Sequence, residues 1–197
     1  GFIITGTAPK QVLLRAIGPS LTGAGVPNAL ADPTMTLNGP GSFTPITNNN
    51  WRDTQQAEIE ATGLAPTNDL ESAILVTLDP GSYTAVVSGV ANGTGVGLVE
   101  IYDQDHAAAS KLANIATRAF VSTGNDIVIA GFILGNGIMN DTIVVRGIGP
   151  SLTGFGVPNA LANPTLSLRD SQGAVIRANN NWEEDPAQAA ALTALNL

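Results

Sequence analysis

The sequence contains a long internal repeat without gaps. Residues 15–37 read RAIGPSLTGAGVPNALADPTMTL and recur as RGIGPSLTGFGVPNALANPTLSL at residues 146–168, with five differences in 23 positions. The same offset of 131 residues continues to two Asn-Asn-Asn-Trp segments, which end at Trp51 and Trp182. Solenoid and propeller repeats are about 20–50 residues long. A period this long therefore predicts two tandem domains, each with its own core.

Composition favours β-structure in both domains. Hydrophobic residues make up 44% of the chain and charged residues only 12%, and there are 22 glycines and 12 prolines. Typical globular domains contain about 25% charged residues, and frequent Gly and Pro mark the many turns of all-β chains. We expect an all-β fold of tandem β-sandwich-like repeats, jelly-roll or Ig-like, each with one short helix.

The expected helix follows the tryptophan in each copy. In the first copy, Asp53 is the predicted N-cap, Gln56 completes a capping box and Gly63 marks the C-terminal end. In the second copy, Asp185 is the predicted N-cap and Pro186 occupies the first helical position.

Domain boundaries follow from the repeat and from a polar connector, DQDHAAAS, at residues 103–110. We predict a first β-repeat at residues 1–106, lacking its initial strands, and a second at residues 107–197, lacking its final three strands. Those three strands, ESAILVTL, SYTAVVSG and VGLVEIYD, occur once, within residues 71–103, and are expected to form a meander. In an alternative arrangement, residues 112–130 fold back onto the first repeat.

Charge excludes several classes of partner. The net charge is −8, and the eight Lys and Arg residues are scattered singly, so they cannot form the basic stripe that tracks phosphates. Nucleic acid and anionic membrane surfaces are therefore excluded as partners. No apolar run reaches the roughly 20 residues of a membrane-spanning helix, which predicts no membrane insertion. Cysteine is absent, which removes disulfides and thiolate metal sites. Together with the low charge, this composition favours a secreted bacterial protein.

The candidates for catalysis and metal binding are weak. His106 is the sole histidine, so a Ser-His-Asp triad has one possible base, and a solvated connector residue is the simpler interpretation. Glu100, Asp103 and Asp105 could supply oxygen ligands to Ca²⁺, but the EF-hand pattern is missing. We predict no enzyme activity, no metal and no cofactor.

Two other motifs resemble ligand sites in composition alone. The loop that reads AIGPSLTG at residues 16–23 and GIGPSLTG at residues 147–154 lacks the Lys-Ser/Thr of a phosphate-binding loop, and Pro19 and Pro150 each remove an amide donor. The acidic run at residues 183–185 lies at an expected helix start, where acids stabilise the helix. We interpret the loop as a turn and the acidic run as a cap.

Two pairs of residues are the most informative. Arg15 lies in an apolar strand and would need a partner if buried, and Glu100 is the acid within the similar strand LVEIY. We predict that Arg15 and Glu100 pair across the sheet. Trp51 and Trp182 could stack on sugars, although a core anchor under the helix is the favoured interpretation.

Four motifs, RAIGPSL, ADPTMTL, NNNW and ESAILVTLDPGSYTAVVSG, resemble a β-domain repeat found in tandem in large secreted and cell-surface proteins of environmental bacteria. The resemblance covers essentially the whole chain. It implies a structural β-domain in an extracellular or cell-surface location and a repeat boundary near His106.

Three classes of function compete: structural polymer, binding module and enzyme. The predicted strands carry almost no charge, whereas exposed sheet edges are normally protected by Lys, Pro or bulges. We therefore expect a structural subunit of an extracellular bacterial filament or tube, which assembles with copies of itself, or with adjacent repeats of a longer chain, by strand complementation and apolar interfaces. The alternative is a secreted carbohydrate-binding or adhesion module with Trp51 at a glycan site.

Overall fold

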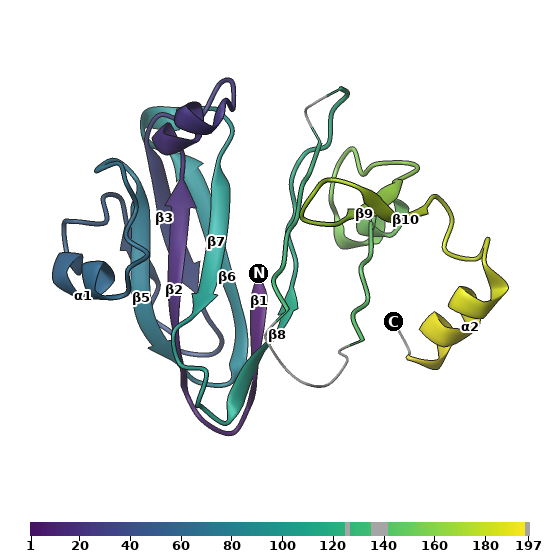
Figure 1. The fold of residues 1–197 in the computed structure, drawn as a ribbon, viewed down its shortest axis with the longest axis horizontal. Coiled ribbons are helices and arrows are strands. Elements are labelled where there is room, and N and C mark those ends of the chain that lie inside the picture. Colours follow the sequence, from purple (N-terminus) through teal and green to yellow (C-terminus); the bar gives the residue numbers. More distant parts are fainter. Residues whose placement is uncertain (125–126, 135–141, 196–197) are drawn as a thin grey trace. The chain divides into compact units, whose positions relative to one another are not determined.

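The computed structural model describes residues 1–124, 127–134 and 142–195, and the chain divides into two compact units. Unit 1 comprises Gly1–Arg118 and unit 2 comprises Ala119–Leu197. The described residues form three antiparallel sheets and a few short helices (Figure 1). The expected all-β fold class is therefore confirmed.

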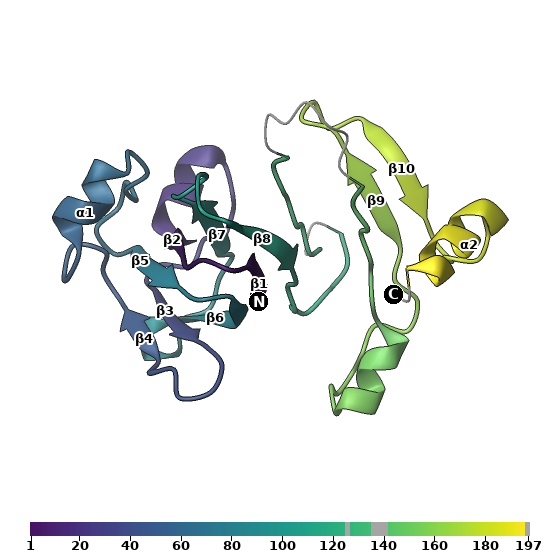
Figure 2. The same ribbon diagram turned by 90° about the horizontal axis from the view of Figure 1, so that it is seen from below.

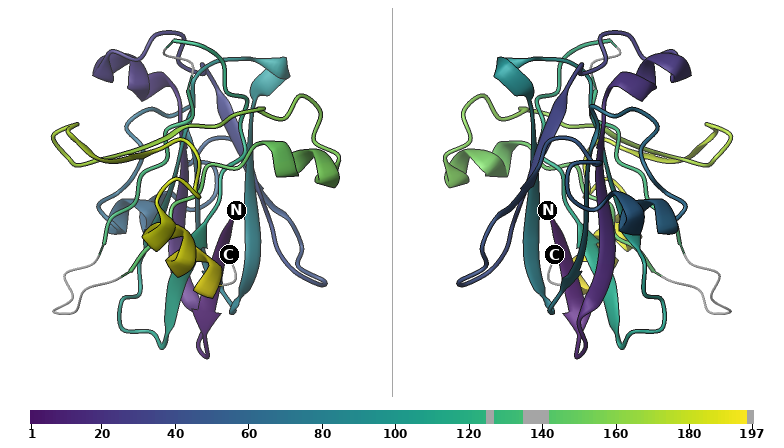
Figure 3. Two further views of the ribbon diagram at one scale, coloured as in Figure 1. Left: turned by 90° about the vertical axis from the view of Figure 1, so that its right-hand side faces the viewer. Right: turned by 90° about the vertical axis from the view of Figure 1, so that its left-hand side faces the viewer.

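Unit 1 contains eight strands and three short helical segments. The strands are β1 (Phe2–Gly6), β2 (Lys10–Ile17), β3 (Pro33–Asn38), β4 (Ile46–Asn48), β5 (Ser72–Leu78), β6 (Gly81–Gly89), β7 (Leu98–Asp103) and β8 (Ser110–Ile115). The helical segments are η1 (Pro19–Ala24), α1 (Gln56–Ala61) and η2 (Val90–Asn92). Both 3-10 segments, η1 and η2, lie at the same end of the unit (Figure 3).

The strands of unit 1 are distributed over two sheets. The order of the larger sheet is β4-β3-β6-β1-β8, and the smaller sheet is β5-β2-β7. The three segments expected to form a meander are strands, but the prediction that they pair as a meander is wrong. β5 and β7 flank β2 in one sheet, whereas β6 pairs with β1 and β3 in the other, because Asp79 and Pro80 turn the chain from one sheet to the other.

The core of unit 1 explains this arrangement. Side chains from both sheets meet in one cluster, formed by Phe2, Ile4, Val12, Leu14, Ala16, Met35, Leu37, Ile74, Leu78 and Tyr83. The opposite face of β2 contributes Leu13 to a second cluster with Trp51, Ile59 and Ala73. α1 lies beside β5 (Figure 2). Because successive residues of a strand point to opposite faces, the apolar residues on both sides of β2 are covered, as its sequence predicts.

The boundary expected at residue 106 lies too early. β8 follows that position but pairs antiparallel with β1, from Phe2 opposite Ile115 to Gly6 opposite Ser110. The amide of Ala116 also donates to the carbonyl of Gly1 at 2.9 Å. The alternative, in which residues 112–130 fold back onto the first repeat, is therefore correct as far as β8 extends, and the unit ends at Arg118.

The helix of unit 1 begins differently from the prediction. Its N-cap residue is Gln55, without a side-chain cap bond, and the Asp53 carboxylate instead accepts from the side-chain Nδ2 of Asn50 at 3.2 Å. The predicted capping box is therefore wrong, because the turn at residues 51–54 uses the Asp53 carboxylate. Gly63 follows the helix with φ of 70°, a conformation that favours glycine.

Unit 2 contains η3 (Pro150–Phe155), β9 (Leu166–Arg169), β10 (Val175–Asn179) and α2 (Pro186–Ala194) among its described residues. The predicted cap of α2 is confirmed, since Asp185 accepts from the amides of Ala187 and Gln188 and Pro186 begins the helix.

Corresponding parts of the two copies have the same local structure. β9 pairs with β10 in the register in which β3 pairs with β4: Leu166 lies opposite Asn179 as Met35 lies opposite Asn48. A Cβ added to Gly18 would lie 2.1 Å from the carbonyl oxygen of Leu30, and the same contact at Gly149 would be 2.0 Å. The repeat therefore encodes these local conformations in both units.

None of the helices formed by the described residues is long and apolar enough to span a membrane.

Candidate functional site

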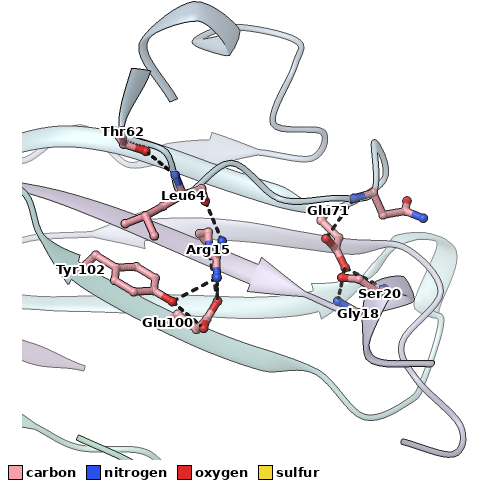
Figure 4. Close-up of polar contacts among 9 residues, drawn as sticks. Arg15, Gly18, Ser20, Thr62, Leu64, Glu71, Glu100 and Tyr102 are labelled. Carbon is pink, nitrogen blue, oxygen red and sulfur yellow. Dashed lines mark hydrogen bonds and ion pairs between the residues drawn. The ribbon is translucent and has the colours of Figure 1, made fainter. Parts of the chain in front are cut away.

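The structure brings Arg15 and Glu100 together at directly opposed positions of β2 and β7 (Figure 4). Arg15 Nε and Nη2 both donate to Glu100 Oε2, at 2.9 and 2.5 Å. The side chains are 16% and 22% exposed, so the pair is largely shielded from water. Cross-strand neighbours of opposite charge stabilise a sheet, and here they join β2 to β7.

Two further groups hold the guanidinium of Arg15 in place. Its Nη1 donates to the carbonyl oxygen of Leu64 at 2.6 Å, and its Nη2 donates to the Tyr102 hydroxyl at 3.1 Å. The Thr62 hydroxyl accepts from the Leu64 amide at 3.1 Å, which fixes the backbone that presents this carbonyl. The segment after α1 is thus connected to the sheet through Arg15.

Tyr102 completes this cluster. Its hydroxyl donates to Glu100 Oε1 at 2.8 Å, and the Arg15 guanidinium carbon lies 5.0 Å from the centre of its ring. Burial, and next the hydrogen bond to Glu100, raise the pKa of Tyr102 above its ordinary value. The hydroxyl therefore remains a donor, and the cluster connects β2, β7 and the segment after α1.

A second polar centre surrounds Glu71, which immediately precedes β5 and is fully buried. Its Oε1 accepts from the amides of Gly18 and Ser20, at 3.1 and 2.9 Å, and from the Ser20 hydroxyl (Figure 4). Its Oε2 accepts from the amide of Asn68 at 3.4 Å. A buried carboxylate is tolerated only when such donors replace its water.

Glu71 is the important residue that sequence reasoning missed. The loop at residues 16–23 does not match a phosphate-binding loop, in part because Pro19 has no amide hydrogen to donate. In the structure the residues on either side of Pro19 donate, and the anion that they bind is the side chain of Glu71. The available signal was an acid directly before an apolar strand, ESAILVTL, which alone does not identify its partner.

Trp51 is a core residue. Its side chain is 2% exposed, and its Nε1 donates to the carbonyl oxygen of Asn68 at 3.2 Å. The glycan site expected in the alternative interpretation therefore cannot use Trp51, because a sugar needs an open ring face. Trp182, at the corresponding position of unit 2, is 50% exposed.

The outer edge of β5 is protected, contrary to the expectation from its uncharged sequence. The Gln55 side chain accepts from the Leu75 amide at 3.1 Å and donates to the Leu75 carbonyl at 2.8 Å. The Asn48 side chain accepts from the Ala73 amide at 3.0 Å. Side-chain amides thus occupy positions that a neighbouring strand would otherwise pair with, and this edge of unit 1 is not a free pairing surface.

The acidic residues at the end of β7 and directly after it also have structural partners. Asp103 accepts from the buried Lys10 at 2.7 Å and from the Asp105 amide at 2.9 Å. His106 is exposed, with its Nδ1 3.8 Å from Asp103. Among the described residues, no three His, Cys, Asp or Glu side chains are grouped so that they could hold a metal ion.

Unit 2 exposes side chains whose counterparts form the core of unit 1. Five apolar residues of unit 1 are buried: Val12, Leu14, Ile17, Leu30 and Trp51. Their repeat counterparts in unit 2 are 40–50% exposed: Ile143, Val145, Ile148, Leu161 and Trp182. Phe155, in place of Ala24, is 85% exposed. Monomeric proteins rarely expose such a set of large apolar residues unless it is an interaction site. These exposed positions, which we call the open face and define by Ile143, Val145, Ile148, Leu161 and Trp182, are the candidate functional site. In unit 1 the counterparts of Ile143 and Val145 lie in the core between the two sheets, and the counterpart of Trp182 lies on the opposite face of β2.

Comparisons of the chain with protein-family models, with curated proteins and with solved structures found no match.

Proposed function

We propose that this chain is a structural subunit of an extracellular bacterial filament or tube. In this proposal each repeat is a sandwich-like module, and segments of neighbouring subunits cover the open face of unit 2. The single observation that carries the proposal is the contrast between equivalent positions, such as Trp51 at 2% exposure and Trp182 at 50%. The resemblance to repeats of large secreted and cell-surface proteins supports the location.

The energetic argument concerns the apolar residues of the open face. Burying one fully exposed large apolar side chain stabilises a protein by about 1.5–3 kcal/mol, so covering one that is already half buried contributes roughly half of that. The open face contains five such side chains, each 40–50% exposed. Association must offset the loss of translational and rotational freedom, and several such side chains acting together can do so. An interface of this kind is driven by burial and depends little on salt.

Strand addition is the favoured mode of contact because of the edges in unit 2. In unit 1, β3 pairs with β4 on one side and with β6 on the other. In unit 2, the equivalent strand β9 pairs with β10 alone among the described residues. The other edge of β9 can accept a strand, as in β-augmentation.

Repeated contacts of this type would propagate. An open face that accepts a segment from a different surface of the next subunit forms a heterologous interface, and such interfaces generate rings or filaments. The carbohydrate-binding alternative has lost its main support, because Trp51 is buried. The exposed Trp182 is explained by its equivalence to a core residue.

The test is assembly of the purified full chain, followed by electron microscopy and sedimentation over a range of concentrations. We expect filaments or tubes above a threshold concentration. Val145→Lys places a charge on the open face and should abolish them, whereas Ser171→Lys adds the same charge at an exposed turn of unit 2 and should not. Dispersed monomers at every concentration, for native material as well, would reject the proposal.

A further inference from the structure

We propose that the open face of unit 2 binds a β-strand segment with the chemistry of residues 68–103, and that three polar positions in unit 2 select that segment. The inference rests on the proposed assembly and specifies its partner. The three positions are the loop at residues 149–151, Arg146 and Asn179. Each is the repeat counterpart of a residue that holds this segment in unit 1.

The first position is a cradle for a carboxylate. In unit 1 the amides of Gly18 and Ser20 and the Ser20 hydroxyl donate to the buried Glu71. Gly149 has φ of −132° and ψ of −79°, and Gly18 has −139° and −79°. The loop of unit 2 is too short to identify a ligand by itself. The loop of unit 1 has the same conformation and binds a carboxylate, which identifies the ligand class. The amides in unit 2 therefore match a glutamate at the start of the incoming segment.

The second position is Arg146, the counterpart of Arg15. In unit 1 Arg15 pairs with Glu100 of β7, the last strand of the segment. Arg146 is exposed and forms no ion pair with a described residue. A guanidinium on an apolar face favours a segment that brings a carboxylate to it, and repels one that brings a cation.

The third position is Asn179, the counterpart of Asn48. In both copies this side chain donates to a backbone carbonyl two residues later, at 3.0 Å for Asn50 and 3.1 Å for Asn181. In unit 1 the amide oxygen of Asn48 then accepts from Ala73 of β5. The conserved local bond orients Asn179 in the same way, so its oxygen can accept from the first strand of an incoming segment.

The apolar pattern of the segment agrees with these three positions. In unit 1, Ile74 and Leu78 of β5 pack in the cluster that contains Val12, Leu14 and Met35. The counterparts of these three residues are Ile143, Val145 and Leu166. A segment with the spacing of β5 would therefore place two apolar side chains on the open face while its glutamate reaches the cradle.

The experiment titrates the full chain, kept below its assembly threshold, with a fluorescein-labelled synthetic peptide spanning residues 68–105. We expect saturable binding by anisotropy and a blue shift in the fluorescence of Trp182, which becomes covered as Trp51 is. Trp182→Phe should abolish the blue shift while binding persists, which assigns the peptide to unit 2. An unchanged shift in this variant would instead indicate exchange into unit 1 and would overturn the inference.

Variants then test selection. Glu71→Gln in the peptide should weaken binding about tenfold, the order expected when one charge-assisted interaction is lost. Arg146→Met in the protein should weaken binding of the unmodified peptide to a similar extent. The Glu100→Gln peptide should bind the Arg146→Met protein as well as it binds the native protein. Arg118→Met, which removes an exposed arginine of unit 1, is the control and should bind normally.

The outcomes separate the two proposals. Filaments without peptide binding, or binding that is indifferent to both Glu71→Gln and Arg146→Met, would overturn this inference and leave the proposed assembly. Selective peptide binding without filaments under any condition would support the inference and reject the assembly.

Discussion

Units 1 and 2 have the same local structure in several segments and differ in the strands that cover those segments. The loop at residues 18–20, the β3–β4 hairpin and the Asn-Asn-Asn-Trp turn of unit 1 have counterparts in unit 2 with the same backbone conformation and strand register. Only unit 1 has β5, β6 and β7 around these elements. The conformation of these three elements is thus set within the repeated segment. Residues 142–148, the counterparts of residues 11–17, form no strand, so the strand β2 and the burial of the core depend on β5 and β7 outside that segment.

The polar contacts show the same division. Bonds within the repeated segment occur in both units, such as those from the third Asn of each triplet to an acid three residues later (Asn50 to Asp53 and Asn181 to Glu184). Bonds that leave the segment, to Glu71, Ala73 and Glu100, are found in unit 1. Unit 2 therefore retains donors and acceptors already arranged for partners of the same kind.

The largest expected difference between the units concerns the two tryptophans. Trp51→Ala should lower the free energy of unfolding of unit 1 by about 3–5 kcal/mol, because it removes a large buried side chain and leaves a cavity. Trp182→Ala should change the stability of the dispersed chain by less than about 1 kcal/mol, since its ring is half exposed. Chemical denaturation of both variants measures the difference, and equal losses would show that Trp182 is already covered in the monomer.

Glu71 should give the next largest effect. Glu71→Gln replaces an acceptor by a group that presents an NH₂ to the amides of Gly18 and Ser20, which should cost about 2–4 kcal/mol. Glu183→Gln removes an exposed acid of unit 2 and should remain within about 0.5 kcal/mol of the parent. Similar small values for both variants in urea unfolding would contradict the structural role of the Glu71 cradle.

A smaller difference in stability is expected between variants of Arg15 and of its counterpart Arg146. Arg15→Met should destabilise unit 1 by about 1–3 kcal/mol, less than the roughly 3–5 kcal/mol of a fully buried pair, because both partners retain some contact with water. Arg146→Met should have almost no effect on the dispersed chain. The double variant Arg15→Met/Glu100→Met should recover part of the loss, and a double-mutant cycle by thermal unfolding would show no coupling if the pair were unimportant.

The smallest effect is a dependence on alkaline pH that is restricted to unit 1, which contains both tyrosines, Tyr83 and Tyr102. Burial raises the pKa of each above 10.0. Their contribution to stability is therefore complete below pH 10, and is lost as pH rises from there through the raised folded-state pKa. Tyr102→Phe should flatten this alkaline decline in a pH series of unfolding curves, and an unchanged slope would exclude Tyr102 as a cause.

Sequence reasoning identified strands of unit 1 and the partners of the charged pair, because these depend on local patterns. Alternation in QVLLRAIG indicated a strand covered on both faces, and the isolated charges of Arg15 and Glu100 each required a partner. The position of β8 was assigned to the wrong repeat, since pairing with β1 is decided by tertiary contacts. Glu71 was overlooked because its donors lie about fifty residues away in a loop that has no pattern of its own for carboxylate binding.

Hydrogen exchange of equivalent strands tests the central claim most directly. In the dispersed chain, the amides of β3 should be protected by pairing with both β4 and β6, whereas those of β9 that point away from β10 should exchange quickly. In the assembled state these β9 amides should become as slow as those of β3. Equal protection of β3 and β9 in the dispersed chain, or fast exchange of β9 within filaments, would contradict the proposal that neighbouring segments cover unit 2.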